Sequence, residues 1–404
     1  MTEQATVPSV VLRNLILVCM GLTAAVVAQT MLLLSVPLRA LELGATTATV
    51  GFVVSAPYLL PLLFAIPLGG AVTKLGAQKM FGLGALGMVA GPMVSLLFDH
   101  LLALVLTQLM IGLSHVMLVI SAQSVVAGLG RGKKLEQYFG WYTMFISGGQ
   151  LLGPLLAGVL IDRFSMALTF SVIGLIPIIS ITCSLFLQGD AKRGIVTNQP
   201  KGYRAQIQIV RTNKGMQLSM LASSAALFAV GAHMAFMPVY LDTLAFSATT
   251  IGILISLRAL SAMTIRPFMT QVIDLLGRRS TTFIVCVACV GVGLSFAGFT
   301  SSPWLLALLA ILVGLGSGLS QPLSVVALAE HVPAEQRASA LGMRLTANRG
   351  SQLMAPIFLG LMAEGFGFHW AFLMAGLGIL SACWFLIRMA PSYDQLEAAQ
   401  PARK

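Results

Sequence analysis

Long apolar blocks are the feature of this sequence that most restricts its fold. Each block has roughly 19 to 28 residues, which is enough for a helix to cross a bilayer core about 30 Å thick. The chain is 57% hydrophobic and only 9% charged, whereas about a quarter of the residues of a soluble domain are charged. Because lipid offers no hydrogen-bond partners, each backbone group must be satisfied within its own segment. The sequence therefore predicts an all-α polytopic membrane protein.

Polar breaks between the apolar blocks predict twelve transmembrane helices. Six of them precede a long polar stretch, at Leu12 to Val36, Thr47 to Val72, Met80 to Phe98, Leu101 to Gly128, Tyr138 to Ile161 and Ala167 to Leu187. Six more follow that stretch, at Met216 to Leu241, Ala248 to Val272, Thr281 to Phe299, Pro303 to Ala329, Ala338 to Met362 and Trp370 to Met389.

An internal repeat divides these helices into two groups of six. Residues 149–158 read GQLLGPLLAG, and residues 351–360 read SQLMAPIFLG, 202 positions later. The same offset relates Gly112 to Gly314. We expect two pseudo-symmetric six-helix halves at 1–187 and 216–390, joined by a basic linker at 188–215 and followed by a tail at 391–404.

The Lys and Arg residues predict the topology. Of the 24 such residues, four lie well inside predicted helices, and 18 of the other 20 lie in segments or at helix ends that share the side of the N-terminus. Only Arg39 and Arg163 lie on the opposite side. Because cytoplasmic loops retain Lys and Arg, we expect both termini in the cytoplasm. We expect the protein itself to be a multi-pass protein of the cell inner (cytoplasmic) membrane. The same bias explains the net charge of +11 without nucleic acid. The first apolar block is too long for a cleavable signal peptide.

With its twelve spans, two halves and basic linker, the chain resembles the major facilitator superfamily of secondary transporters. Two loops carry a related motif, reading GGAVTKLGAQK at residues 69–79 and VIDLLGRR at residues 272–279. The resemblance implies a conformational latch in these loops, with an acid that engages a neighbouring helix N-terminus. Thr73 replaces that acid in the first loop, so the latch is expected to be weaker in the N-terminal half. The residues implied are Gly69, Gly76, Asp274, Gly277, Arg278 and Arg279.

The fifth predicted helix resembles the antiporter motif of this superfamily at Gly149, Gly153, Pro154 and Gly158. Glycines four residues apart form a flat face for close helix contact, and proline permits a bend. We therefore expect a hinge here, although any tightly packed membrane helix could use the same face. In the fourth helix, Gln108 stands where exporters of the family often carry an arginine, which argues against a proton relay at that position.

Ionisable residues within the spans are the functional candidates, because a charge in the bilayer costs about 2.5 to 3.5 kcal/mol on insertion scales. All thirteen acids fall in loops, tails or helix ends, whereas Arg258, Arg266, Arg344 and Arg349 lie within helices. Helical periodicity places Arg344, Asn348 and Gln352 on one stripe, with Arg349 about 140° away from Arg344.

These arginines have two competing interpretations. They could bind a substrate with a carboxylate or phosphate-like group, or they could brace helices through backbone carbonyls. We favour Arg258 and the Arg344 stripe as cavity-lining and Arg349 as a packing or gating residue, and the reverse placement of Arg349 stays open. The polar side chains expected to line the N-terminal half are Gln29, Tyr58 and Tyr142, and interhelical hydrogen bonding is the alternative for each.

Because no carboxylate is expected near the midplane, proton coupling would depend on a histidine, on Glu42 or Asp242 near the outer helix ends, or on Asp274 on the inner side. His115 and His233 lie within predicted helices, and histidine titrates near neutral pH. Both could instead be hydrogen-bonded packing residues.

These features predict a transporter that works by alternating access. The leading function is proton-coupled export of a small anionic or zwitterionic compound, such as a drug, metabolite or siderophore. Import of an organic anion by proton symport is the alternative, and a channel or non-transporting receptor is a weaker one. The sequence has no P-loop, HExxH or catalytic constellation, so we expect no enzyme activity, cofactor or metal. One chain holds both halves, and a monomer embedded in lipid should suffice.

Overall fold

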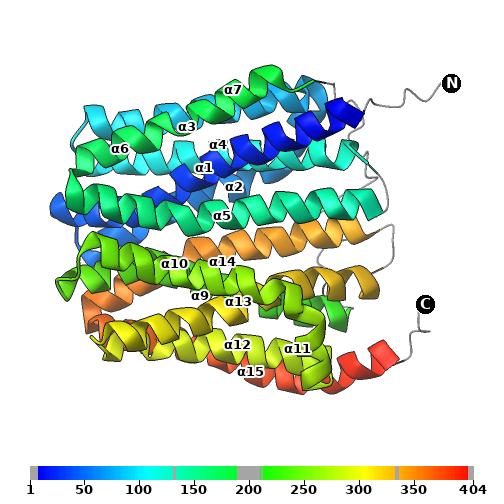
Figure 1. Ribbon diagram of the computed structural model, residues 1–404. Coiled ribbons are helices and arrows are strands. Elements are labelled where there is room, and N and C mark those ends of the chain that lie inside the picture. Colours follow the sequence, from blue (N-terminus) through cyan, green and yellow to red (C-terminus); the bar gives the residue numbers. More distant parts are fainter. Residues whose placement is uncertain (1–7, 131–132, 189–209, 211–212, 333–335, 399–404) are drawn as a thin grey trace. The chain divides into compact units, whose positions relative to one another are not determined.

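The computed structural model of this protein describes residues 8–130, 133–188, 210, 213–332 and 336–398 (Figure 1). All regular secondary structure within these residues is helical. Within these residues there is no β-strand, which confirms the predicted all-α class. Most of the expected linker, 189–209 and 211–212, lies outside the described residues, as does the end of the expected tail, 399–404. The last helix continues past the expected boundary at Met389 to Ala398.

The helices alternate with short connections. In the first half they are α1 (Pro8–Glu42), α2 (Thr47–Leu75), α3 (Ala77–Leu97), α4 (Leu101–Gly128), α5 (Lys133–Arg163), α6 (Met166–Leu175) and α7 (Ile178–Phe186). In the second half they are α9 (Lys214–Thr243), α10 (Ala248–Ile265), η1 (Arg266–Phe268), α11 (Met269–Leu276), α12 (Arg279–Ser295), η2 (Ala297–Phe299), α13 (Pro303–His331), α14 (Arg337–Phe366) and α15 (Phe368–Ala398).

Among the described residues, eleven stretches are long and apolar enough to cross a membrane. They match eleven of the twelve predicted spans. The remaining predicted span, at 338–362, corresponds to α14. This helix has 30 residues, but its charged residues lower its hydropathy; they are Arg337, Arg344, Arg349 and Glu364. The length of α14 still suffices for a span, since a helix rises 1.5 Å per residue.

Two predicted spans are interrupted at prolines. The span expected at 167–187 forms α6 and α7, with Pro177 at the break, and the span expected at 248–272 bends through η1 at Pro267. Proline has no backbone N–H and its ring clashes with the preceding turn, so a break at either residue has a local cause. Other prolines, such as Pro154 in α5, are accommodated within a helix.

The described chain divides into two compact units. Those of its residues that lie within Met1–Ala45, Ala56–Val196 and Ala245–Ser256 form unit 1. In this unit α1 packs on α4, α5 and α7, and α3 packs on α4, α6 and α7 (Figure 1). The first nine residues of α10 also belong to unit 1, although the rest of that helix does not.

Unit 2 holds the described residues within Thr46–Ser55, Thr197–Leu244 and Leu257–Lys404. Here α9 contacts α12, α13, α14 and α15, and it is buried along most of its length. The start of α2 belongs to this unit, which mirrors the assignment of α10 to unit 1. Large apolar side chains such as Trp304, 85% exposed, lie on the outer surface, as expected where lipid replaces water.

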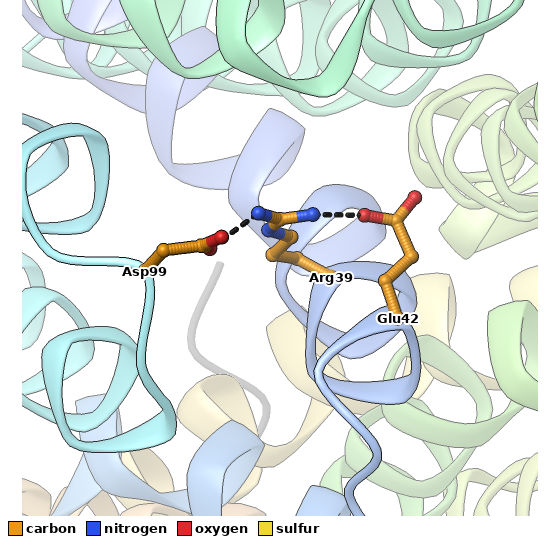
Figure 2. A network of polar contacts seen from close by, with 3 residues as sticks. All are labelled: Arg39, Glu42 and Asp99. Atoms are coloured by element: carbon orange, nitrogen blue, oxygen red, sulfur yellow. Dashed lines mark hydrogen bonds and ion pairs between the residues drawn. The ribbon is translucent and has the colours of Figure 1, made fainter.

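An ion-pair network joins helix ends in unit 1. The guanidinium of Arg39, at the end of α1, lies between the carboxylates of Glu42 and Asp99 (Figure 2). Asp99 stands in the connection between α3 and α4. All three side chains are partly or well exposed, so the network orders this end but contributes little to stability.

Candidate functional site

Arg344 is the centre of a buried polar network in unit 2. It projects from α14 and is only 4% exposed. Its Nε donates to the Ser324 hydroxyl at 2.7 Å, and its Nη2 donates to the carbonyl and side-chain oxygens of Gln321 at 3.0 and 2.9 Å. All three acceptors belong to α13 and are neutral. The network therefore orients the guanidinium without neutralising its charge.

Asn348, one turn further along α14, extends this network to α9. Its Oδ1 accepts hydrogen bonds from the hydroxyls of Ser223 and Ser224 at 3.0 and 3.4 Å. Gln321 in turn donates to the carbonyl oxygen of Ser223 at 3.1 Å. Three helices of unit 2 are thus joined through hydrogen bonds in their interior, where each bond is stronger than it would be in water.

Gln352 does not continue the network, although it was expected on the same stripe. Its Oε1 accepts a hydrogen bond from Nη1 of Arg349 at 3.1 Å. Its backbone lies against Gly231 of α9, where a Cβ would be 3.4 Å from the Gln352 Cα. The predicted stripe therefore separates into two groups, with Arg344 and Asn348 bonded to α13 and α9 and Gln352 bonded to Arg349.

Arg258 forms a second buried cationic group in unit 2. It lies on α10, is 5% exposed, and its Nη2 approaches the sulfur of Met234 on α9 at 3.4 Å. Its carbonyl accepts a hydrogen bond from Ser261 at 3.0 Å and faces Gly314 of α13. The absence of a side chain at Gly314 lets α13 approach this turn of α10.

His233 lies next to Arg258. It is 1% exposed, and neither ring nitrogen has a hydrogen-bond partner within the described part of the chain. Arg258 contacts Met234, the residue that follows His233 on α9. A proton taken up by this imidazole would therefore place two positive charges side by side, which is unfavourable in a low dielectric.

The other predicted lining residues belong to unit 1. Tyr142 is buried on α5, and its ring packs edge-on against Phe139 with centroids 5.8 Å apart. Tyr58 is buried on α2. Gln29 on α1 and His115 on α4 are partly buried. The Arg344 network, by contrast, lies in unit 2.

In the second motif loop, the described contacts are made by the arginines. Gly277 ends α11 with φ 78°, a left-handed conformation that glycine adopts without strain. Arg278 pairs with Asp394 of α15 at 3.1 Å, and Arg279 pairs with Glu330 of α13. A surface cavity of about 710 Å³ borders this loop. Asp274, the expected latch acid, lies on α11.

The first motif loop lies between α2 and α3. Gly69 is within α2, and Gly76 precedes α3 with φ 88°. This dihedral is again in the region that favours glycine.

The glycines of α5 form two contact faces. Gly149 and Gly153 lie against α1, where a Cβ would be 2.9 Å from Val26 Cγ1 and 2.7 Å from the Val27 carbonyl oxygen, respectively. Gly158 faces the first turn of α10, where a Cβ would be 2.8 Å from the Ala248 carbonyl carbon. The predicted close-packing face of the fifth helix is therefore occupied along its length.

Sequence reasoning missed the partners of Arg344. Gln321 and Ser324 are three residues apart on α13, within the stretch SQPLS, so both fall on one helix face. That spacing of polar residues inside an apolar span was the available signal. Ser223 and Ser224 on α9 gave none, because serine is common where membrane helices pack.

Comparison with known proteins places this fold among membrane transporters. A bacterial homologue of the human lysosomal transporter Spinster has a TM-score of 0.76 at 13% identity, covering 96% of this chain and 97% of its own. The nucleoside transporter NupG has a TM-score of 0.80 at 15% identity, with 93% and 99% covered. A peptide transporter of the POT type has a TM-score of 0.76 at 14% identity, with 98% and 97% covered. These similarities concern the fold.

The sequence comparisons define the family. The model of the Major Facilitator Superfamily matches residues 18–247 and 219–403, so this chain belongs to that superfamily. A protein of Lactococcus lactis named a multi-drug resistance efflux pump, PmrA homolog, is 31% identical over 149 residues, which are 35% of this chain and 36% of that relative. An uncharacterised transporter of this superfamily from Methanocaldococcus jannaschii is 19% identical over 88% of this chain and 91% of its own.

Proposed function

We propose that this membrane transporter exports a small organic anion or zwitterion by alternating access, in exchange for protons. The observation that carries the proposal is the buried guanidinium of Arg344, whose hydrogen bonds all go to neutral groups. A buried charge is stable only when it is compensated. A carboxylate or phosphate-like group on a substrate would provide that compensation, and Arg258 supplies a second buried cation in the same unit.

The direction of transport is proposed from two weaker features. The glycine and proline pattern of α5 resembles that of antiporters, and one relative that covers part of the chain is named an efflux pump. The excess of Lys and Arg on one side supports an inner-membrane location with both termini in the cytoplasm. In this topology Arg39, Asp99, Asp162 and Glu364 face the outside, and the loop with Arg278 faces the cytoplasm.

Substitution of the buried arginines tests the anion site. We expect Arg344→Ala and Arg258→Ala, made separately, each to lower efflux of an anionic substrate at least about tenfold, because each removes a buried charge. The measurement is efflux from cells at matched protein levels in the membrane. Arg388→Ala is the matched control, since this guanidinium lies over the exposed ring of Trp384, 3.8 Å from its centroid. Full efflux in both arginine variants would contradict the proposal.

A second candidate function, import of an organic anion with a proton, is favoured by the position of His233. An anion beside Arg258 would reduce the repulsion that a protonated His233 experiences. Binding of the anion and of the proton would then strengthen each other, as symport requires.

Uptake into proteoliposomes under imposed pH gradients separates the two candidates. For export by exchange, we expect an anionic substrate to move against the direction of proton flow; for symport, it should move with the protons. His233→Gln should abolish the response to the gradient in either case, while exchange of substrate for substrate continues. A response that His233→Gln leaves unchanged would exclude His233 as the coupling residue.

A further inference from the structure

Two carboxylates in this protein bind the first turns of helices that start elsewhere in the chain. Both oxygens of Asp162, at the end of α5, accept hydrogen bonds from α10, from the amides of Ala248 at 3.0 Å and Thr249 at 2.7 Å. Glu364, at the end of α14, accepts a hydrogen bond from the amide of Ala48 in α2 at 2.8 Å. We call these contacts the carboxylate caps.

The caps are related by the internal repeat. Asp162 and Glu364 are separated by the same 202 positions as the two halves, and each stands four residues after a glycine and eight after a proline. Residues at i, i+4 and i+8 follow one ridge along a helix. Each helix therefore presents a proline carbonyl, a glycine and a carboxylate in one row, PxxxGxxxD in α5 and PxxxGxxxE in α14.

Glycines in these rows and in the partner helices bring the main chains into contact. In unit 1, a Cβ at Gly252 of α10 would lie 3.0 Å from the carbonyl carbon of Pro154. In unit 2, a Cβ at Gly51 of α2 would lie 2.5 Å from the carbonyl oxygen of Pro356, and one at Gly360 would lie 2.7 Å from that of Thr47. Each carboxylate cap thus closes a row of contacts between main chains.

The capped first turns of α10 and α2 belong to a different compact unit from the rest of their own helices. The first nine residues of α10 belong to unit 1 and the remainder to unit 2, whereas α2 starts in unit 2 and continues in unit 1. These rows break when α10 and α2 move as whole helices together with their own six-helix halves. Thr46 and Ser247 also cap their own helices, accepting from the amides of Thr49 and Thr250 at 3.3 and 3.2 Å. After release of the carboxylates, each helix still has a local cap.

We propose that Asp162 and Glu364 are paired latches that hold the first turns of α10 and α2 on α5 and α14 and release them during alternating access. The inference rests on alternating access, which is part of the proposed function, but not on the identity of the substrate. A carboxylate is suited to this role because the helix dipole and unsatisfied first-turn amides favour a negative charge.

The carboxylate form of Glu364 is maintained at neutral pH. Hydrogen bonds from the Thr46 hydroxyl and the Ala48 amide lower the pKa of Glu364 below its ordinary value. A lowered pKa means that the contact is complete above the ordinary value and is lost only as the pH falls through the lowered one. The Glu364 latch is therefore opened by conformational change rather than by protonation near neutral pH.

Hydrogen exchange of the purified full-length protein tests the latches without a transport assay. We expect Asp162→Asn to speed exchange about tenfold across residues 248–256, and Glu364→Gln to do so across 48–55, because a hydrogen bond to a charged group is weakened. Glu42→Gln is the control, since that carboxylate binds the Arg39 side chain and no helix amide. Exchange equal to that of the native protein, or equal acceleration in Glu42→Gln, would overturn the proposal. So would acceleration confined to the first two amides, which would identify simple caps.

A second pair of variants separates latch release from a folding defect. Gly252→Ala leaves Asp162 unchanged but forces α10 away from Pro154, so exchange across 248–256 should again accelerate. Gly148→Ala on α5 is the matched control, because a Cβ there meets no atom within 4 Å. If Gly252→Ala behaves like Gly148→Ala, the rows do not hold the first turn of α10 in place and the proposal is wrong. Full anion transport in both arginine variants would contradict the proposed anion site but leave these exchange results unchanged, so the two proposals fail separately.

Discussion

Replacing Gly112 with alanine is expected to lower the stability of this protein strongly, although the change adds only one methyl group. A Cβ on Gly112 of α4 would lie 2.6 Å from the carbonyl carbon and 2.7 Å from the Cα of Pro57 in α2. Both atoms belong to the backbone, so no side-chain rotation relieves the overlap. The two helices must separate, and overpacking of this kind costs about 1 to 3 kcal/mol or more.

Gly314, its equivalent in the other half, should behave in the same way. A Cβ there would lie 3.1 Å from the carbonyl carbon of Arg258, and closer still to its oxygen and to the Ser261 hydroxyl. Because the turn that must move carries Arg258, Gly314→Ala is also expected to impair transport.

Thermal unfolding of the detergent-solubilised variants measures both effects. Gly140→Ala and Gly342→Ala provide the controls, since these glycines are related by the same repeat and a Cβ at either meets nothing within 4 Å. Alanine in a helix interior is favoured over glycine by about 1 kcal/mol, so the controls should keep or raise the unfolding temperature. Equal unfolding temperatures for the Gly112 and Gly140 variants would show that α2 and α4 adjust to the added methyl group.

The repeat that predicted these glycines shows how far the sequence alone reaches. An offset of 202 residues identifies Gly112 and Gly314 as equivalent, but it does not identify Pro57 or Arg258 as the residues they contact. Such partners follow from helix packing, which depends on side chains from several segments at once. The sequence likewise does not predict which prolines interrupt a helix, since Pro177 interrupts a span whereas Pro154 lies within a continuous helix.

The arginine site was predicted with similar limits. Hydropathy identified Arg344 as a buried charge, and a spacing of four placed Asn348 on its face. The same spacing did not predict that Gln352 would leave the Arg344 network and bond with Arg349. The reason is that a long flexible side chain reaches neighbours that helical geometry places to one side. The acceptors on α13 were missed because a single Gln within an apolar span resembles any interhelical hydrogen-bonding residue.

Gln321 offers the sharpest test of whether the charge of Arg344 attracts the substrate. Its side-chain oxygen lies 2.9 Å from Nη2 of Arg344, so Gln321→Glu would place a carboxylate there with almost no change in shape. We expect this variant to fold, because the new ion pair with Arg344 offsets the loss of the hydrogen bond from Gln321 to the Ser223 carbonyl oxygen. The guanidinium would then be compensated internally, and apparent affinity for an anionic substrate should fall at least about tenfold.

Gln321→Leu is the companion variant, since it removes the side-chain hydrogen bonds of Gln321 without adding a charge. It should lower stability by about 1.5 to 3 kcal/mol, the value of a hydrogen bond to a charged group, while Arg344 stays positive and still attracts anions. The decisive comparison is substrate affinity in the two variants, measured on protein whose unfolding temperature is known. Should Gln321→Glu bind and transport anions as well as the native protein, Arg344 would be a structural brace between α13 and α14. The search for the substrate site would then move to Arg258.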